Sequence, residues 1–349
     1  MKPLYQQSAF PIFQNRMYAS REQARQCPTG DIELVEDPNT GIVCNRAFRP
    51  ELMVYDEHYQ NEQGLSPAFQ QHLASVAAIV ERTLGTQNLV EVGCGKGYFL
   101  EALSNRGVGV TGFDPAYEGH NPRIRREAFS PGIIDRAQGL ILRHVLEHIQ
   151  HPIAFLRDIA AANNHTGRIY IEVPCFDWIC QRRAWFDIFY EHANYFRLSD
   201  FHRWFGEVVE AGHLFGGQYL FVVAELASLR AAADPSPALA RLPDDMLTSI
   251  ERLGAGLARP RVVWGGASKG VIFSLLMERM GTPIDTVIDI NPAKQGKYIA
   301  GTGIRVSAPE EVLPSLPPGT PICVMNSNYL QEIRQMTQDK FTYTGVDHE

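Results

Sequence analysis

The sequence has little excess charge of either sign and no long apolar run. Its 349 residues include 32 Lys and Arg against 39 Asp and Glu, for a formal net charge of -7. Such a chain has no global basic field with which to hold a nucleic-acid backbone or an anionic membrane. No stretch approaches the roughly 20 apolar residues of a membrane helix, and the first residues lack the apolar region of a signal peptide. These absences predict a cytoplasmic protein that binds neither nucleic acid nor membranes.

Paired cysteines are absent as well. No two of the six cysteines stand at the C-x-x-C spacing that a zinc-binding turn or a redox couple requires. We therefore expect a reduced compartment, no bound metal, and cysteines that serve as small buried hydrophobic side chains. The six are Cys27, Cys44, Cys94, Cys175, Cys180 and Cys323.

The length and the 45% apolar content predict two or three domains. Prolines interrupt residues 1–65, which predicts an irregular N-terminal cap of short strands and loops. Short apolar runs alternate with helical patterns over 66–228, which predicts a parallel, doubly wound α/β sheet. Residues 229–258 read as a linker and a helix. The strand-glycine-helix pattern restarts over 259–349, which predicts a second, smaller Rossmann-like α/β domain.

A glycine-rich loop gives the sharpest local signal. Residues 91–97 read E-V-G-C-G-K-G and lie between a predicted strand and a predicted helix. Glycines there permit a tight turn and let a ligand approach bare backbone. A dinucleotide site would have G-x-G-x-x-G, and Glu91 would repel a pyrophosphate but suits a cation. Asp114 ends the next predicted strand, where a carboxylate can accept hydrogen bonds from both ribose hydroxyls. A nicotinamide oxidoreductase is therefore the weaker interpretation.

This combination resembles motif I of the class I methyltransferases that depend on S-adenosylmethionine (SAM). The resemblance implies a class I Rossmann-like sheet with SAM as the cofactor, Glu91 facing the methionine ammonium and Asp114 the ribose. The H-V-L-E-H segment after the next strand looks like the part that passes under the cofactor, which places His144 there. An alternative is that His144 and Glu147 only cap a helix; a zinc site is not expected because no Glu follows the first His. The loop residues that would line the cofactor are Gly93, Cys94, Gly95 and Gly97.

Glu191 and His192 lie in an aromatic segment, residues 186–196. An adjacent Glu and His flanked by Tyr can position a base near neutral pH and supply phenolic hydrogen bonds to a developing oxyanion. The alternative is that both residues only pin this segment to its neighbour.

The order of the separate motifs is more specific than any one of them. It resembles the sugar C-methyltransferases that act on nucleotide-linked keto-deoxysugars, and the resemblance covers residues 55–328. The motifs that carry it are E-V-P at 172–174, F-D-I-F-Y-E-H-A-N-Y-F at 186–196, G-G at 216–217, W-G-G-A-S-K-G at 264–270, D-I-N-P-A-K-Q-G-K-Y at 289–298 and G-T-G-I at 301–304.

The resemblance implies a reaction at carbon. A base removes a proton next to a ketone, hydrogen bonds hold the enolate, and the carbanion takes the methyl group of SAM. His192 is the expected base, with Glu191 orienting it and raising its basicity. Tyr190 and Tyr59 are the candidates that would hold the oxyanion.

The C-terminal domain would then bind the acceptor, a small molecule such as a nucleotide sugar. Its glycine loop precedes a predicted helix whose N-terminal amides could meet a diphosphate. The candidate acceptor-binding residues are Gly266, Ser268 and Lys269. The alternative is a glycine turn that only packs in a ligand-free α/β domain.

Three departures from the family fall in the acceptor half or the cap. The family usually opens with a zinc region built on cysteine pairs, but Cys27 and Cys44 stand alone. The helix entry at 59–66 lacks the family's serines, and Phe189 stands where a tyrosine is common. The alternatives are therefore O- or N-methylation of another small molecule, or a non-catalytic SAM- or nucleotide-binding protein, and the oligomeric state stays open.

Overall fold

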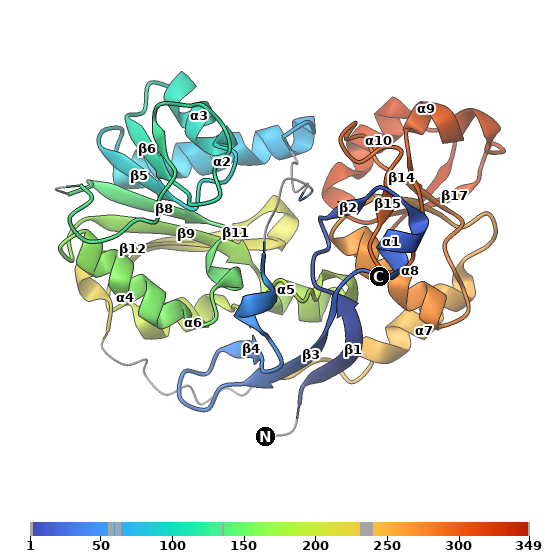
Figure 1. Cartoon of the computed structure of the whole chain (residues 1–349), viewed down its shortest axis with the longest axis horizontal. Helices are drawn as coiled ribbons and strands as arrows, with labels where there is room; N and C mark the ends of the chain where they lie inside the picture. Colours follow the sequence, from blue (N-terminus) through green and yellow to red (C-terminus); the bar gives the residue numbers. More distant parts are fainter. Residues whose placement is uncertain (1–2, 55–58, 60–63, 135, 231–239, 348–349) are drawn as a thin grey trace.

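The computed structural model describes residues 3–54, 59, 64–134, 136–230 and 240–347. Residues 60–63 of the predicted helix entry (59–66) and residues 231–239 of the predicted linker lie outside these residues. The structure therefore does not test the predictions made for them. Figure 1 shows an N-terminal cap, a large mixed sheet with its helices, and a smaller α/β unit beside it. No helix among the described residues combines the length and the apolar character that crossing a bilayer requires.

The cap consists of short elements, as the prolines in this part predict. Three of its strands join β10 (Asn194–Tyr195), from the middle of the chain, in an antiparallel sheet of order β1-β3-β4-β10. Strand β2 pairs instead with β15 (Tyr298–Ile299) of the smaller unit. The cap therefore contacts both other parts. Its elements are β1 (Tyr5–Pro11), β2 (Met17–Tyr18), α1 (Arg21–Arg25), β3 (Thr29–Glu36), β4 (Val43–Asn45) and the 3-10 turn η1 (Pro50–Leu52).

The large sheet has seven strands in the order β11-β12-β9-β8-β5-β6-β7. Strands β9, β8, β5, β6 and β7 are parallel, whereas β12 runs antiparallel to both of its neighbours. The strands are β5 (Leu89–Val92), β6 (Val110–Phe113), β7 (Ile124–Arg125), β8 (Gly139–Arg143), β9 (Arg168–Pro174), β11 (Val208–Leu214) and β12 (Tyr219–Glu225). The helices are α2 (Pro67–Leu84), α3 (Tyr98–Asn105), α4 (Pro152–Ala162), α5 (Phe176–Gln181) and α6 (Leu198–Trp204); four 3-10 turns are η2 (Leu146–His148), η3 (Trp185–Asp187), η4 (Phe215–Gly217) and η5 (Leu226–Ser228).

Local sequence explains the elements that lead into the glycine loop. Helix α2 begins at Pro67 because the Ser66 hydroxyl accepts a hydrogen bond from the Phe69 amide (3.3 Å), and it ends at Leu84, before Gly85, whose φ is 89°. All four residues of β5 are buried, as expected for a parallel strand covered on both faces. The glycine loop then leaves β5 at the carboxyl edge of the sheet.

The smaller unit is a five-stranded parallel sheet of order β16-β14-β13-β17-β18. The predicted second α/β unit is therefore present, with helix α8 directly after its glycine loop. Its strands are β13 (Val262–Trp264), β14 (Thr286–Ile288), β16 (Val306–Ser307), β17 (Pro321–Val324) and β18 (Thr342–Gly345), and its helices and turns are α7 (Met246–Gly256), α8 (Lys269–Arg279), α9 (Pro309–Val312), η6 (Leu313–Ser315), η7 (Ser327–Tyr329) and α10 (Leu330–Met336).

One hydrophobic core runs through all three parts. A single cluster contains Phe10 of the cap, Trp185 of η3 and Phe273 of α8, each at most 1% exposed. The rings of Trp185 and Phe273 are stacked, with centroids 5.5 Å apart and planes at 12°. The smaller unit is thus joined to the large sheet by apolar packing.

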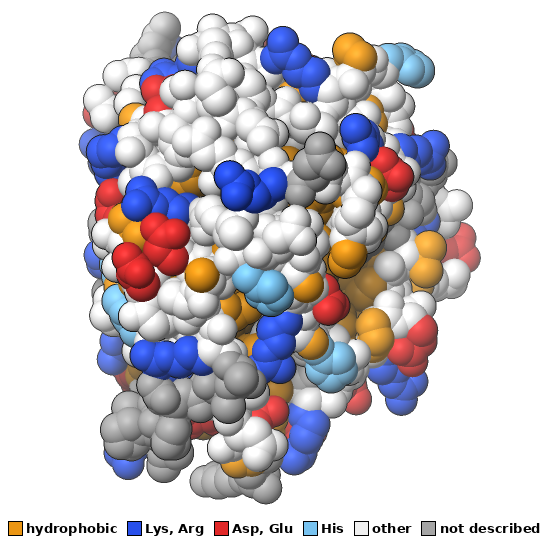
Figure 2. All heavy atoms as spheres, turned by 90° about the vertical axis from the view of Figure 1, so that its left-hand side faces the viewer, with side chains coloured by type: hydrophobic (Ala, Val, Ile, Leu, Met, Phe, Trp, Pro, Cys, Tyr) orange, Lys and Arg blue, Asp and Glu red, His pale blue; other side chains and the backbone are white. Residues whose placement is uncertain are grey.

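The surface carries mixed charge. On the face that Figure 2 shows, Lys and Arg side chains are spread singly between acidic groups and uncharged polar surface. This pattern agrees with the formal net charge of -7.

We expect Phe273→Ala to lower the free energy of unfolding by about 3–5 kcal/mol, because it removes a buried ring from the junction and leaves a cavity. Urea unfolding followed by circular dichroism measures the change. Leu247→Ala is the control, since Leu247 is 51% exposed and should change stability by less than about 0.5 kcal/mol. Equal stability of both variants would show that the stack does not join the parts.

Candidate functional site between two sheets

A cavity of about 400 Å³ lies where the carboxyl ends of the parallel strands of the two sheets meet. Loops that follow β5, β8 and β9 line one side, and loops that follow β13, β14 and β17 line the other. Ligands of open α/β sheets bind at such edges. The structure brings together ten of the residues selected from sequence, which line this cavity: Tyr59, Glu91, Gly93, Cys94, Gly95, His144, Glu191, His192, Ser268 and Lys269. Four others do not line it: Gly97, Asp114, Tyr190 and Gly266.

The glycine loop adopts a backbone that only glycine accepts readily. Gly93, Gly95 and Gly97 have φ of 72°, 55° and 84°. A Cβ on Gly95 would meet nothing within 4 Å, so open space lies against bare backbone there. Asp114, at the end of β6, accepts a hydrogen bond from the Gly95 amide (2.7 Å). Asp114 therefore contacts the glycine loop but is not one of the residues that line the cavity.

Cys94 packs beneath the loop. Its side chain is 8% exposed, and its sulfur lies 2.7 Å from where a Cβ on Gly112 of β6 would stand. It is one of four cysteines that are buried, as predicted; Cys44 and Cys180 are half-buried.

Glu91 is a buried carboxylate with an unused oxygen. The side chain is 3% exposed, and its Oε2 has no hydrogen-bond partner among the described residues. Burial raises the pKa of Glu91 to about 8, against the opposing charge of Arg143. An unpartnered buried carboxylate beside bare loop backbone fits a cationic amine such as the ammonium of SAM.

A second buried carboxylate, Glu172 of β9, organises the loop after β8. It is fully buried, and its Oε1 accepts hydrogen bonds from Arg143 (3.0 Å), His72 (3.1 Å) and His144 (3.0 Å). The hydroxyl of Tyr170 donates to Oε2 (2.6 Å). Burial alone would raise the pKa of Glu172, but Arg143 and the two histidines hold it well below its usual range.

His144 is cationic in this setting. Burial opposes its charge, but hydrogen bonds to Glu147 and Glu172 raise its pKa to about 9. Its Nδ1 lies 3.3 Å from Glu147 Oε1 and its Nε2 lies 3.0 Å from Glu172 Oε1. His144 therefore bridges two carboxylates at the floor of the cavity.

His192 lies with Glu147 and His148, and not with its neighbour Glu191. One ligand atom from each of Glu147, His148 and His192 lies within 4.8 Å of the other two. Burial and the adjacent His148 lower the pKa of His192 to about 3, so its imidazole is neutral, and its Nδ1 has no hydrogen-bond partner among the described residues.

The predicted pairing of Glu191 with His192 is wrong. The Glu191 carboxylate accepts hydrogen bonds from the Gln14 amide (2.7 Å) and from the Tyr59 hydroxyl (2.6 Å), so the cap holds it. Burial raises the pKa of Glu191. The basicity of His192 is likewise lowered, not raised as the sequence suggested.

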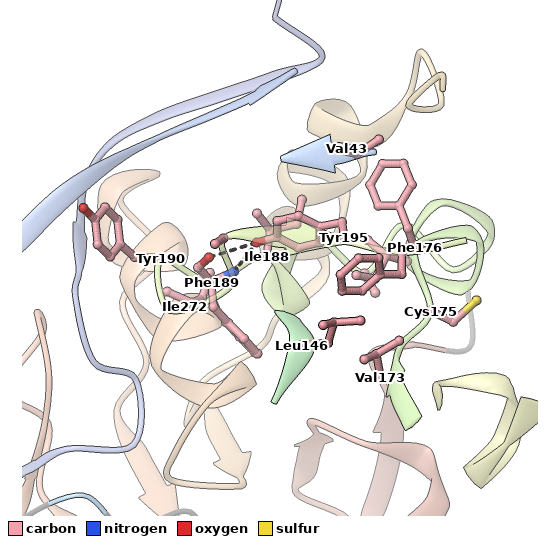
Figure 3. Close-up of a cluster of buried hydrophobic side chains, with 14 of the residues drawn as sticks. Val43, Leu146, Val173, Cys175, Phe176, Ile188, Phe189, Tyr190, Tyr195 and Ile272 are labelled. Carbon is pink, nitrogen blue, oxygen red and sulfur yellow. Dashed lines mark hydrogen bonds between the residues drawn. The ribbon is translucent and has the colours of Figure 1, made fainter. Parts of the chain in front are cut away.

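The structure separates the two candidate tyrosines. Tyr59 lines the cavity, and the Nδ2 of Asn15 donates a hydrogen bond to its hydroxyl (3.3 Å). Tyr190 points into the cap instead, where its ring lies 5.8 Å from that of Phe48 and its hydroxyl accepts from the Arg49 amide. Figure 3 shows its ring directed away from Phe189 and Tyr195. Tyr190 is therefore not placed to hold an oxyanion in this cavity.

The second glycine loop brings a buried cation to the cavity. Lys269 is 5% exposed; its Nζ lies 3.3 Å from Asp187 Oδ2 and 4.6 Å from the ring centroid of Trp178. Ser268 donates a hydrogen bond to Asn15 of the cap (2.8 Å). Gly266 lies behind the lining, where its amide donates to Asp289 Oδ2 (2.9 Å).

Several cavity residues were missed from the sequence. Glu147 was considered only as a cap, and His148 only as half of a zinc pair with His144. Asn15 carried no signal, because nothing local links the cap to a cavity built by other segments. Arg143 is a further lining residue that no motif singled out, and Asp187 belonged to the 186–196 motif but was given no role.

Comparison with known proteins agrees with this geometry. Residues 59–208 match the family model of a methyltransferase domain. No curated protein matches the sequence significantly.

Solved structures of methyltransferases resemble part of the chain. A SAM-dependent methyltransferase from Archaeoglobus fulgidus is 16% identical, covers 46% of this chain and 100% of its own, and has a TM-score of 0.32. The 1,6-didemethyltoxoflavin N1-methyltransferase of Burkholderia thailandensis, solved with its acceptor and S-adenosylhomocysteine, is 15% identical, covers 59% and 96%, and has a TM-score of 0.34. Scores this low carry no argument about function.

The family match spans the glycine loop, Asp114 and the strands of the large sheet up to the start of β11. That sheet has the doubly wound arrangement that the resemblance to class I methyltransferases implies. Residues 59–208 therefore form a class I SAM-dependent methyltransferase domain within this chain.

Proposed function

We propose that the enzyme methylates a carbon next to a ketone in a small acceptor that carries a diphosphate, such as a nucleotide-linked sugar. One observation carries the proposal: a single cavity joins the Glu91 loop, the neutral imidazole of His192 and the buried cation Lys269. The Glu91 loop suits a cationic cofactor, the imidazole suits removal of a proton from carbon, and the lysine suits the diphosphate group of the acceptor. SAM, when bound, supplies an electrophilic methyl group.

The cofactor side is assigned to Glu91, the glycine loop and Asp114. Glu91 Oε2 would pair with the methionine ammonium, and the bare backbone at Gly95 would lie against the cofactor. Asp114 lies beside Gly95, where its carboxylate could accept hydrogen bonds from ribose hydroxyls. His144, held between Glu147 and Glu172, forms the floor below.

The role of general base, which takes the proton from the acceptor carbon, is assigned to His192. A base must present a lone pair, and the Nδ1 of His192 is buried without a hydrogen-bond partner among the residues that the structure describes. Glu147 takes the role first given to Glu191, because its ionised carboxylate lies beside His192 and can stabilise the imidazolium that forms. Tyr59 is the remaining phenolic candidate for the enolate oxygen, a role that requires its hydroxyl to turn from Glu191 toward the acceptor.

The acceptor side is assigned to the loop before α8. Helix α8 begins at Lys269, so its first amides and the Lys269 ammonium lie at one end of the cavity. Amides at a helix N-terminus bind phosphate groups through hydrogen bonds and the helix dipole. Ser268 would add a hydroxyl. The experiment that tests the whole proposal is incubation with SAM and a panel of nucleotide-linked keto-deoxysugars.

Product NMR decides between the possible methylated atoms, since a methyl group on carbon resonates far upfield of one on oxygen. Transfer to no member of the panel, by enzyme that binds SAM, would overturn the nucleotide-sugar assignment. An O- or N-methyl product would overturn the carbon assignment.

We expect Glu91→Gln to weaken SAM binding by about 1.5–3 kcal/mol, the range for a hydrogen bond to a charged group. Burial raises the pKa of Glu91 to about 8, so the free enzyme holds a proton there at neutral pH that must leave before the carboxylate can pair with an ammonium. SAM affinity of the wild type should therefore rise between about pH 6 and 7.5. Calorimetry in buffers of different ionisation enthalpy measures the released proton.

Glu251→Gln, on the exposed face of α7, is the matched control and should bind SAM as the wild type does. Unchanged affinity and unchanged proton release in Glu91→Gln would remove Glu91 from the cofactor site.

His192→Ala should reduce turnover by about 10²–10⁴-fold, the usual contribution of a general base, while SAM affinity stays unchanged. Single-turnover assays and thermal melts are run on the same variant, with exposed His202→Ala as the control. If His192 only pins the segment, stability falls by about 1–3 kcal/mol, and the folded variant methylates at close to the wild-type rate.

Replacing both Lys269 and Asp187 by Met and Asn should weaken binding of uridine or thymidine diphosphate by about 10–100-fold, because the cation at the helix start is lost. The double variant is used because Lys269→Met alone would leave the Asp187 carboxylate buried and unpaired. Asp187→Asn alone, which keeps the lysine, and exposed Lys340→Met are the controls. If neither diphosphate binds the wild-type enzyme, the proposal that the acceptor carries a diphosphate is wrong.

A further inference from the structure

Glu147, His148 and His192 form a cluster that acid-base chemistry alone does not account for. Glu147 and His148 lie in the turn η2 after β8, and His192 comes from the loop before β10. One donor atom from each lies within 4.8 Å of the other two, and all three side chains line the cavity. Among the residues that the structure describes, this is the one such group of His, Cys, Asp and Glu side chains.

Two atoms of the cluster are buried without a hydrogen-bond partner among the described residues: Glu147 Oε2 and His192 Nδ1. Each such atom costs about 1–3 kcal/mol in the folded state. With Nδ1 as the unprotonated nitrogen of the imidazole, both atoms are acceptors, so they cannot satisfy each other. A group that accepts electron pairs from both would remove the cost.

The rest of the cluster is oriented as metal ligands commonly are. His148 Nδ1 lies 2.9 Å from the Glu191 carbonyl oxygen, which can only accept, so Nδ1 carries a proton and Nε2 is the nitrogen that would coordinate a metal. Glu147 Oε1 is held by His144, which fixes the carboxylate and leaves Oε2 as the coordinating atom. Such outer contacts orient ligands in protein metal sites.

We propose that Glu147, His148 and His192 form a site for a divalent transition metal such as Zn²⁺, and that its occupation inhibits methyl transfer. Two imidazoles and one carboxylate, with a further position open to a cavity, are a common ligand set for this class of ion. Ligand atoms around tetrahedral zinc lie about 3.4 Å apart, at bonds of about 2.1 Å. The ligand atoms of the three side chains, which lie within 4.8 Å of one another, must therefore approach by at most about 1.4 Å.

The inhibition follows from the electron pairs. A metal bound to His192 Nδ1 occupies the lone pair that accepts the substrate proton, so the loaded enzyme has no base. This half of the inference rests on the proposed function, whereas the metal site itself does not. The site is also distinct from the cysteine-based zinc region of the family, because Cys27 and Cys44 are not part of the cluster.

The full-length chain, stripped of metal with a chelator, is titrated with ZnCl₂ in a calorimeter. We expect one Zn²⁺ per chain. His192→Ala and Glu147→Gln should each weaken binding by more than about 100-fold, since loss of an outer contact alone costs 10–100-fold. Cys44→Ser and exposed His202→Ala should bind as the wild type does. Bound Co²⁺ in place of zinc should give a visible absorption band that both ligand variants lose.

Thermal melts of each variant in chelator show that it is folded. Absence of zinc binding, or binding that both ligand variants retain, would overturn the site and leave the proposed function to its own test. Turnover on a reactive panel member should fall as zinc fills the site and return with chelator. Zinc binding at these residues without loss of turnover would overturn the inhibition and count against His192 as the base.

Discussion

Two sheets, each with a set of parallel strands, direct the carboxyl ends of those strands toward one cavity. The arrangement of the candidate site depends on this constraint. Loops that leave the carboxyl ends of neighbouring parallel strands lie close together, and helices that follow them present their N-terminal amides there. The large sheet contributes the Glu91 loop and His144 in this way, and the smaller sheet contributes Lys269 at the start of α8. A cationic cofactor and an anionic acceptor can therefore be held from opposite sides.

Charge compensation shapes the floor of that cavity. Three carboxylates are buried near one another, and each meets a different environment. Glu172 has four donors and Glu147 shares His144 with it, whereas Glu91 keeps one oxygen without a partner among the described residues. The first two are stabilised as anions by the protein itself. Burial instead raises the pKa of Glu91, because its pairing is left incomplete. The incomplete site is the one assigned to the cofactor.

Sequence order predicted those features that depend on local geometry. The glycine loop, Asp114 and the loop before α8 each follow a strand within one strand-loop-helix unit, so spacing places them at the correct edge of a sheet. Side-chain direction in the irregular segment 186–196 was not predictable, because no period of 2 or 3.6 applies there. Tyr190 consequently points into the cap and Phe189 into the cavity. The cluster of His192 with Glu147 was not predictable either, because the two residues belong to separate segments of the sequence that only the tertiary fold brings together.

The cap explains why Glu191 was assigned the wrong partner. Gln14, which lies 177 residues before Glu191, donates its amide to that carboxylate, and its carbonyl accepts from the Ser268 amide (3.2 Å) of the smaller unit. Asn15 likewise contacts both Tyr59 and Ser268. These two residues therefore connect the loop beside His192 to the loop at the start of α8 across the cavity. Because two otherwise separate half-sites share these contacts, a shift of the cap would change both, and the N-terminal segment is a structural part of the site and not only its cover.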